Sequence, residues 1–150
     1  EHRKRFDFPD DFMPSIQHAK TVISSWNREF DSNSRFAFAV RIRNDGTLVG
    51  GCELKPKADG AANVSYWVHP RHRRKGIASR AVGLLSNEIA PRFGFSRLEL
   101  LTDSDNLASR GVARNCGYAE SGMRKGQVLH LLKTKPDAQQ GAQPDAFGAG

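Results

Sequence analysis

The stretch from Asn63 to Ser79 constrains the fold most, because it joins a strand, a basic turn and a helix start. Over the first seven residues, Val64, Tyr66 and Val68 alternate with the residues between them, the period-two pattern of a β-strand. Pro70 then ends the strand, since proline cannot donate to a sheet ladder. From Lys75 and Gly76 onward, apolar residues recur every three or four positions, which predicts an amphipathic helix ending near Pro91.

The basic turn lies where the unpaired N–H groups and the dipole of this helix favour an anion. Gly76 and Ala78 keep the backbone open, because larger side chains would stand between a phosphate and the amides. The predicted phosphate site, called here the phosphate turn, is formed by Arg73, Arg74, Lys75, Gly76, Ile77, Ala78 and Ser79. A solvated basic surface or a localisation signal is the alternative for the basic residues alone, and the flanking strand and helix favour the phosphate site.

Elsewhere, hydrophobic periodicity and turn residues predict further elements. Helices are expected over 15–30 and 107–115, and strands over 35–43, 48–55, 97–102, 118–123 and 127–134. Asn44, Asp45 and Gly46 predict a hairpin turn, 57–61 a loop, and the pair Gly50 and Gly51 a bulge or a close backbone approach. The strand, helix and strand from 63 to 102 form a βαβ unit, which predicts two parallel strands.

Two motifs resemble those of the GNAT acyltransferases. Arg73-x-x-Gly76-x-Ala78 is similar to the acetyl-CoA motif of that family, R/Q-x-x-G-x-G/A. A second stretch resembles the RimJ/RimL-like branch, and it consists of Asn106-x-x-Ser109, Val112, Asn115-Cys116-Gly117-Tyr118 and Gly122. The resemblance runs from about Ser15 to Thr134. It implies the α/β GNAT fold, a mixed, mostly antiparallel central sheet flanked by helices, whose central parallel strand pair is splayed around the cofactor.

The resemblance also implies an acetyl-CoA-dependent N-acetyltransferase. Its cofactor would be acetyl-CoA (coenzyme A), and a primary amine would attack the thioester directly in a ternary complex. The acceptor stays open between a protein N-terminus, a polyamine and a small amine. A non-catalytic acyl-CoA-binding module is one alternative, because Asn63 stands where the branch often carries Glu. A basic nucleic-acid-binding domain is another, which the net charge of +7 permits but the concentration of Arg at one helix start does not favour.

The resemblance implies roles for residues outside the phosphate turn. The pantetheine arm is expected along the backbone of Trp67 and Val68, and Asn106 is expected both to cap its helix and to contact that arm. Ser109 is the expected hydrogen-bond donor to the leaving thiolate. A local bond to the helix backbone is the alternative for Ser109.

The sequence marks the general base less clearly than the residues of the cofactor site. His69 could act through water, and Glu53 and Glu99 are further candidates for the base. Both glutamates are interpreted mainly as strand-surface charges. Cys116 is interpreted as core beneath Tyr118 rather than as a nucleophile.

Composition limits the remaining classes. The two cysteines make no disulfide framework and predict a reducing, cytoplasmic location. No apolar run approaches the roughly 20 residues of a membrane span and no metal-ligand cluster is evident, so neither a membrane partner nor a metal is expected. The chain length of 150 residues suits a single GNAT-like domain over 1–134, followed by a flexible tail over 135–150.

Three expectations concern packing and assembly. Trp26 and Phe30 are expected to pack in the core, with contact to substrate as the alternative. The family usually opens with a strand, which residues 1–11 do not predict, so the domain is expected to lack it or to close its sheet differently. Because dimerisation is common in the family, a homodimer is among the expected partners.

Overall fold

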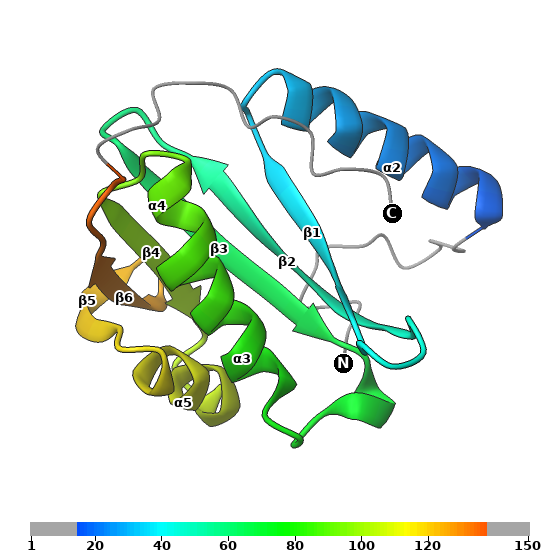
Figure 1. Cartoon of the computed structure of the whole chain (residues 1–150). Helices are drawn as coiled ribbons and strands as arrows, with labels where there is room; N and C mark the ends of the chain where they lie inside the picture. The colour runs from blue at the N-terminus through cyan, green and yellow to red at the C-terminus, as the bar shows by residue number, and fades with distance from the viewer. Residues whose placement is uncertain (1–14, 138–150) are drawn as a thin grey trace.

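A computed structural model describes residues 15–137, and these form one mixed sheet with helices against it (Figure 1). Within this part of the chain the sheet has six strands in the order β1-β2-β3-β4-β6-β5. Their bounds are β1 (Phe36–Arg41), β2 (Leu48–Pro56), β3 (Ala61–Val68), β4 (Arg97–Thr102), β5 (Ala119–Arg124) and β6 (Gln127–Lys133). Strands β3 and β4 pair in parallel and the other neighbours pair antiparallel. The predicted mixed sheet with a central parallel pair is confirmed.

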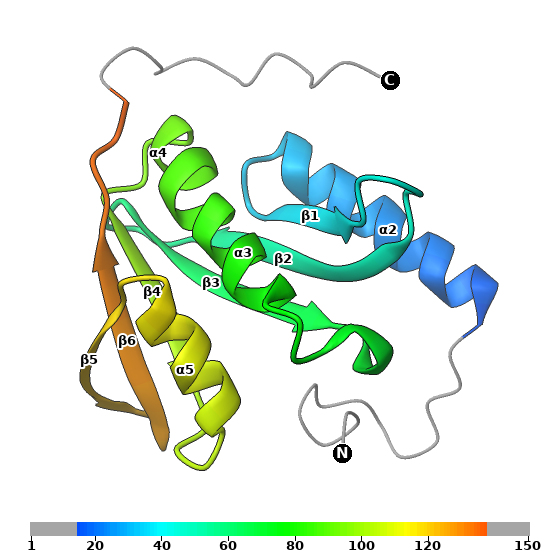
Figure 2. The same cartoon turned by 60° about the horizontal axis from the view of Figure 1, so that its bottom comes forward.

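The helices are α2 (Ile16–Asp31), α3 (Ile77–Leu84), α4 (Ala90–Arg92) and α5 (Leu107–Asn115), with a 3-10 turn at Pro70–His72. Figure 2 shows α3 and α5 side by side over one face of the sheet, while α2 lies along β1 at the outer edge. Ser15 caps α2, because its hydroxyl oxygen accepts a hydrogen bond from the His18 N–H at 3.0 Å. The helices expected over 15–30 and 107–115 are confirmed.

The helix after the basic turn is not uniformly α-helical. A π-helical turn, Leu85–Ile89, separates α3 from α4, and the helical path ends at Arg92, close to the expected end. The turn buries Leu85 and Ser86 completely. The sequence does not predict this π-helical turn, because a single wide turn of five residues changes the spacing of the apolar residues only slightly.

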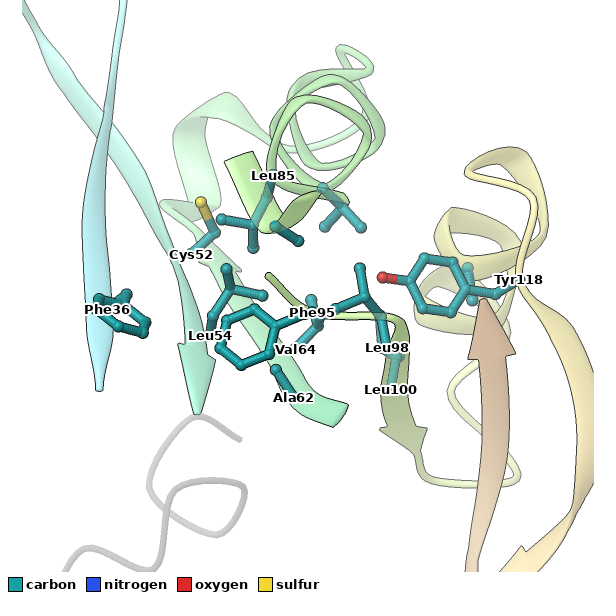
Figure 3. Close-up of a cluster of buried hydrophobic side chains, with 13 residues drawn as sticks. Phe36, Cys52, Leu54, Ala62, Val64, Leu85, Phe95, Leu98, Leu100 and Tyr118 are labelled. Atoms are coloured by element: carbon teal, nitrogen blue, oxygen red, sulfur yellow. The ribbon is translucent and has the colours of Figure 1, made fainter. Parts of the chain in front are cut away.

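The core lies between the sheet and α3, as Figure 3 shows for Leu54, Val64, Leu85 and Leu98. Phe30 packs edge-on against Phe36 with ring centroids 5.2 Å apart, which confirms its expected place in the core. The same expectation for Trp26 is wrong. Its ring is half-buried outside the core cluster, where the Arg35 guanidinium lies 5.8 Å from the ring centroid. A cation–π contact at the sheet edge takes the place of core packing.

Both expectations for Gly50 and Gly51 are confirmed. The register between β1 and β2 shifts between Val40 and Arg41, which marks a bulge. A β-carbon at Gly50 would lie 2.4 Å from the Trp67 carbonyl oxygen. Strand β3 begins at Ala61, two residues before the predicted start, so the expected loop over 57–61 is shorter. Ala61 is fully buried and pairs with Arg97, which extends the strand.

The ends of the chain lie partly outside the described residues. The expectations about a first strand fall within residues 1–14, and β1 is the outer strand of the sheet over 15–137. At the other end, the Asp137 N–H still donates to the Pro91 carbonyl at 3.2 Å. Across 15–137, each helix is too short or too polar to cross a membrane.

Candidate functional site

The start of α3 presents backbone N–H groups without a side-chain cap. Its N-cap is Gly76, with φ of 74° in the left-handed region, and no side chain bonds to the first turn. A β-carbon at Gly76 would have no atom within 4 Å. The glycine therefore serves the positive φ, and the space in front of Ile77, Ala78 and Ser79 is open to an anion.

The basic residues of the turn surround this helix start. Arg73, Arg74 and Lys75 are exposed, and Arg74 also has a positive φ of 58°. The Arg73 Nε donates to the Val68 carbonyl oxygen at 3.3 Å, which folds the turn back onto the end of β3. The structure thus brings the seven residues of the predicted phosphate site together at one helix N-terminus.

The two parallel strands separate beside this turn. Their pairing runs from Ala61 with Arg97 to Val64 with Leu100, and β3 then continues unpaired on the β4 side to Val68. The His69 N–H donates to Val49 in β2 at 2.8 Å. Because successive strand N–H groups point to opposite sides, the Val68 N–H points into the gap between β3 and β4.

Asn106 and Ser109 form one unit at the start of α5. The Asn106 Oδ1 accepts from the Ser109 N–H at 3.2 Å, so the expected helix cap is confirmed. The Asn106 Nδ2 donates to the Ser109 Oγ at 2.9 Å. With its oxygen accepting this bond, the Ser109 hydroxyl keeps its own proton to donate elsewhere.

The three residues predicted to act in catalysis do not meet at one point. Glu53 in β2 pairs with Ser65, whereas His69 lies four residues further along β3, roughly 13 Å away at the rise of a strand. The His69 Nδ1 accepts a hydrogen bond from the Arg71 N–H at 3.3 Å. Ser109 belongs to α5 on the helix-covered face, and Glu53 points to the opposite face.

That opposite face of the sheet is called here the second face. It carries the alternate residues of each strand, because Leu54, Val64 and Leu98 point toward α3. Trp67 belongs to the second face, and its Nε1 would lie 2.6 Å from a β-carbon at Gly51. The Trp67 carbonyl oxygen faces Gly50 of β2, so the expected contact of Trp67 with the pantetheine arm stays a prediction.

Glu99 on the second face is a buried carboxylate, and its interpretation as a surface charge is wrong. Only 2% of its side chain is exposed. Lys57 donates to its Oε2 at 2.7 Å, Arg124 also bonds this oxygen, and Arg97 lies 3.5 Å from Oε1. The Arg124 hydrogen bond, followed by the Lys57 contacts, holds the pKa of Glu99 below its usual range, although burial acts in the opposite direction. The sequence signal is a single acid between Leu98 and Leu100.

The cysteines are free thiols, and burial raises the pKa of Cys52 to about 11. Cys116 is half-buried at the edge of the core, and its thiol donates to the Ser79 carbonyl at 3.3 Å. Burial also raises the pKa of Cys116, which makes a thiolate less accessible. Within 15–137, no three His, Cys, Asp or Glu side chains gather as a metal site would require.

Comparisons with known proteins give a family match. The model described as an acetyltransferase (GNAT) domain matches residues 1–119. The uncharacterized N-acetyltransferase YoaA of Bacillus subtilis is 23% identical over 113 residues, which cover 74% of this chain and 64% of YoaA. The chain therefore spans just under two thirds of that relative.

Two solved structures share the fold. RimL, described as a ribosomal L7/L12 alpha-N-protein acetyltransferase in complex with coenzyme A, superposes with a TM-score of 0.73 at 18% identity, over 83% of this chain and 76% of RimL. Mycobacterium smegmatis RimJ, in complex with a CoA-disulfide, gives a TM-score of 0.73 at 20% identity, over 84% of this chain and 68% of RimJ.

Proposed function

Because this chain belongs to the GNAT acetyltransferase family, we propose that it is an N-acetyltransferase that uses acetyl-CoA and transfers the acetyl group to a primary amine. The observation that carries the proposal is the uncapped start of α3 beside the gap between β3 and β4. Acceptors of three kinds fit this chemistry, namely a protein N-terminus, a polyamine and a small amine.

In this proposal the phosphate turn holds the pyrophosphate of the cosubstrate. The N–H groups of Ile77, Ala78 and Ser79 supply donors, and the exposed Arg74 and Lys75 supply positive charge. The open space at Gly76 supports the fit, since a β-carbon there would meet no atom of the described residues within 4 Å. Asn106 borders the pantetheine arm at the other side of the gap.

The residues around the gap then assist the transfer of the acetyl group. A backbone N–H of β3 near Val68 points into the gap and polarises the thioester carbonyl, and the Ser109 hydroxyl donates a hydrogen bond to the departing sulfur. Holding the amine and thioester together supplies most of the rate, an effect worth up to ~7–11 kcal/mol in ideal cases.

The first experiment is calorimetric titration of acetyl-CoA into the wild-type protein and two variants. Gly76→Asp places a carboxylate where the phosphate binds, and Gly76→Asn is the matched control with the same shape, the same tolerance of positive φ and no charge. We expect saturable binding by the wild type, weaker binding by the Asn variant and none by the Asp variant. Absence of wild-type binding, or equal loss in both variants, would contradict the phosphate site.

A second experiment separates an enzyme from a binding module. Release of free thiol is followed with acetyl-CoA and a panel of primary amines. Turnover supports the proposed enzyme, whereas binding without turnover on any amine favours the non-catalytic acyl-CoA-binding module. Nucleic-acid binding with a steep salt dependence, together with no binding of acetyl-CoA, would support a basic nucleic-acid-binding domain instead.

A further inference from the structure

A pocket opens on the second face where β3 and β4 begin to separate. Its volume is about 230 Å³, and its lining includes Val64, whose pair with Leu100 is the last before the gap. Since the share of one water in the liquid is ~30 Å³, the pocket suits a ligand of roughly eight non-hydrogen atoms. The pocket is therefore small and lies beside the gap, on the side opposite the phosphate turn.

Asn63 provides an unsatisfied acceptor in this pocket. Its Oδ1 is buried and receives no hydrogen bond. In the sheet register Asn63 lies between Lys55 of β2 and Glu99 of β4, and all three line the pocket. A buried acceptor without a donor destabilises the protein, so a ligand N–H group that reaches it is favoured.

The two pocket carboxylates differ in what they can still accept. The oxygens of Glu99 already contact three cationic side chains. Glu53 accepts one hydrogen bond from Ser65, at 2.8 Å, and its other oxygen lies 3.5 Å from the Arg35 Nε. Glu53 therefore retains more acceptor capacity for an ammonium group than Glu99 does.

Lys55 supplies a positive charge at the rim of the pocket. It is exposed, and it makes no ion pair with any described residue. Lys55 and Glu53 are two residues apart on the same face of β2, so their β-carbons are about 7 Å apart. The pocket thus presents acceptors for one cation and a donor for one anion at the spacing of a small zwitterion.

We propose that this pocket is the acceptor site and takes a small zwitterionic amine, with its ammonium at Glu53 and Asn63 and its carboxylate at Lys55. An α-amino acid has this chemistry. The inference rests on the proposed acetyl transfer and names its substrate class.

The reaction balances with this placement. Glu53 takes one proton from the ammonium, and the amine nitrogen forms a bond to the thioester carbonyl carbon. The C–S bond then breaks, and the departing thiolate takes a second proton from the nitrogen. The products are the N-acetyl amino acid, the free thiol and one proton released through Glu53.

Lys55 distinguishes this substrate class from the other two. A polyamine would bring a second cation against Lys55, and a peptide N-terminus carries a neutral amide where an amino acid carries its carboxylate. L-alanine and L-alaninamide therefore form a matched pair of substrates. We expect the wild type to have a higher kcat/KM for alanine, and Lys55→Gln to lower the alanine-to-alaninamide ratio by roughly tenfold.

Lys20→Gln, which removes an exposed charge from α2, is the control and should leave the ratio unchanged. A wild-type enzyme that acetylates alaninamide or putrescine better than alanine would overturn the inference. So would a ratio that Lys55→Gln does not change, or acetyl-CoA binding with no acetylation of alanine.

Saturation-transfer NMR of alanine with the protein alone separates this inference from the proposed function. Transfer to alanine that weakens in Lys55→Gln supports the zwitterion site even if acetyl-CoA does not bind, a result that would refute the proposed function only. No transfer to alanine, together with tight acetyl-CoA binding, would refute the site and leave the proposed function standing.

Discussion

The hydroxyl oxygens of Ser86 and Tyr118 lie 2.7 Å apart inside the core. Ser86 belongs to the π-helical turn between α3 and α4, and Tyr118 follows α5, so this hydrogen bond joins the two helices that cover the sheet. Both residues are buried, and burial raises the pKa of the Tyr118 phenol, which keeps it protonated. The π turn thus places a polar group where a second helix supplies its partner.

Tyr118→Phe should lower the free energy of unfolding by about 1–2 kcal/mol, because it leaves the Ser86 hydroxyl buried without its partner. Urea denaturation of the wild type, Tyr118→Phe, Ser86→Ala and the double variant measures the effect. We expect the double variant to lose less free energy of unfolding than the two single variants lose together. Strict additivity would mean that the two hydroxyls are not coupled.

Gly50→Ala should destabilise the sheet more than Gly51→Ala. A β-carbon at Gly50 would lie 2.4 Å from the backbone oxygen of Trp67, which the ladder holds in place, so we expect a loss of ~1–3 kcal/mol. At Gly51 the nearest atom, 2.6 Å away, belongs to the Trp67 indole, which is 39% exposed and able to move. We therefore expect a smaller loss together with a red-shifted tryptophan emission.

Gly83→Ala is the control for both glycine variants, because a β-carbon at that position of α3 would meet no atom within 4 Å. It should be neutral or stabilising by up to ~1 kcal/mol, the ordinary gain of Ala over Gly in a helix. Equal stability of the Gly50 and Gly83 variants would contradict the close approach.

Local patterns predicted much of this fold. The alternation around Val64 and the spacing after Gly76 were sufficient for β3 and α3, and Gly117, with φ of 84°, ends α5 as expected. The sequence pattern does not mark the start of β3, because Ala61 and Ala62 are small residues that are equally typical of a loop. They are buried only because β4 pairs beside them.

The second face was harder to predict, because its chemistry depends on strand register. Glu99 looks like a surface acid until Lys57 and Arg124, distant in the sequence, are brought against it. In the sequence Asn63 is only a departure from a family pattern, whereas the structure makes its Oδ1 a buried acceptor in a pocket. The roles of such residues depend on the neighbours that other strands place beside them.

Glu99 should contribute to the pH dependence of stability. Because Arg124 and Lys57 hold its folded-state pKa below the usual value, the stabilisation is fully present above the unfolded pKa near ~4.3 and is lost as the pH falls through the folded pKa. Glu99→Gln should therefore flatten the acid side of a plot of unfolding free energy against pH, measured by urea titrations between about pH 6 and 3.

At neutral pH we expect Glu99→Gln to lower the free energy of unfolding by about 1–3 kcal/mol. This is less than the loss expected for a fully buried ion pair, because the three cationic side chains are 30–39% exposed and reach water. Glu88→Gln, which changes an exposed acid of the π turn, is the matched control. An acid limb that is equally steep in the wild type and both variants would show that Glu99 is not held as an ion.

Asn106→Asp should separate the structural role of the α5 start from its proposed catalytic role. An Asp oxygen still accepts from the Ser109 N–H and suits the helix dipole, so stability should change by less than ~0.5 kcal/mol. Asp cannot donate to the Ser109 Oγ as the Asn106 Nδ2 does, and the serine hydroxyl turns to donate to the new carboxylate. The hydrogen bond that Ser109 would donate to the departing thiolate is then made to the introduced carboxylate instead.

Both Asn106→Asp and Ser109→Ala should therefore lower kcat roughly tenfold or more, and the double variant should show no further loss. Steady-state rates of thiol release measure kcat, and urea denaturation measures the stability that the helix cap provides. Asn106→Ala removes both bonds and should lower stability by ~1 kcal/mol as well as kcat. If Asn106→Asp kept the full kcat while Ser109→Ala lost it, Ser109 would not depend on a donor from Asn106 to keep its proton free.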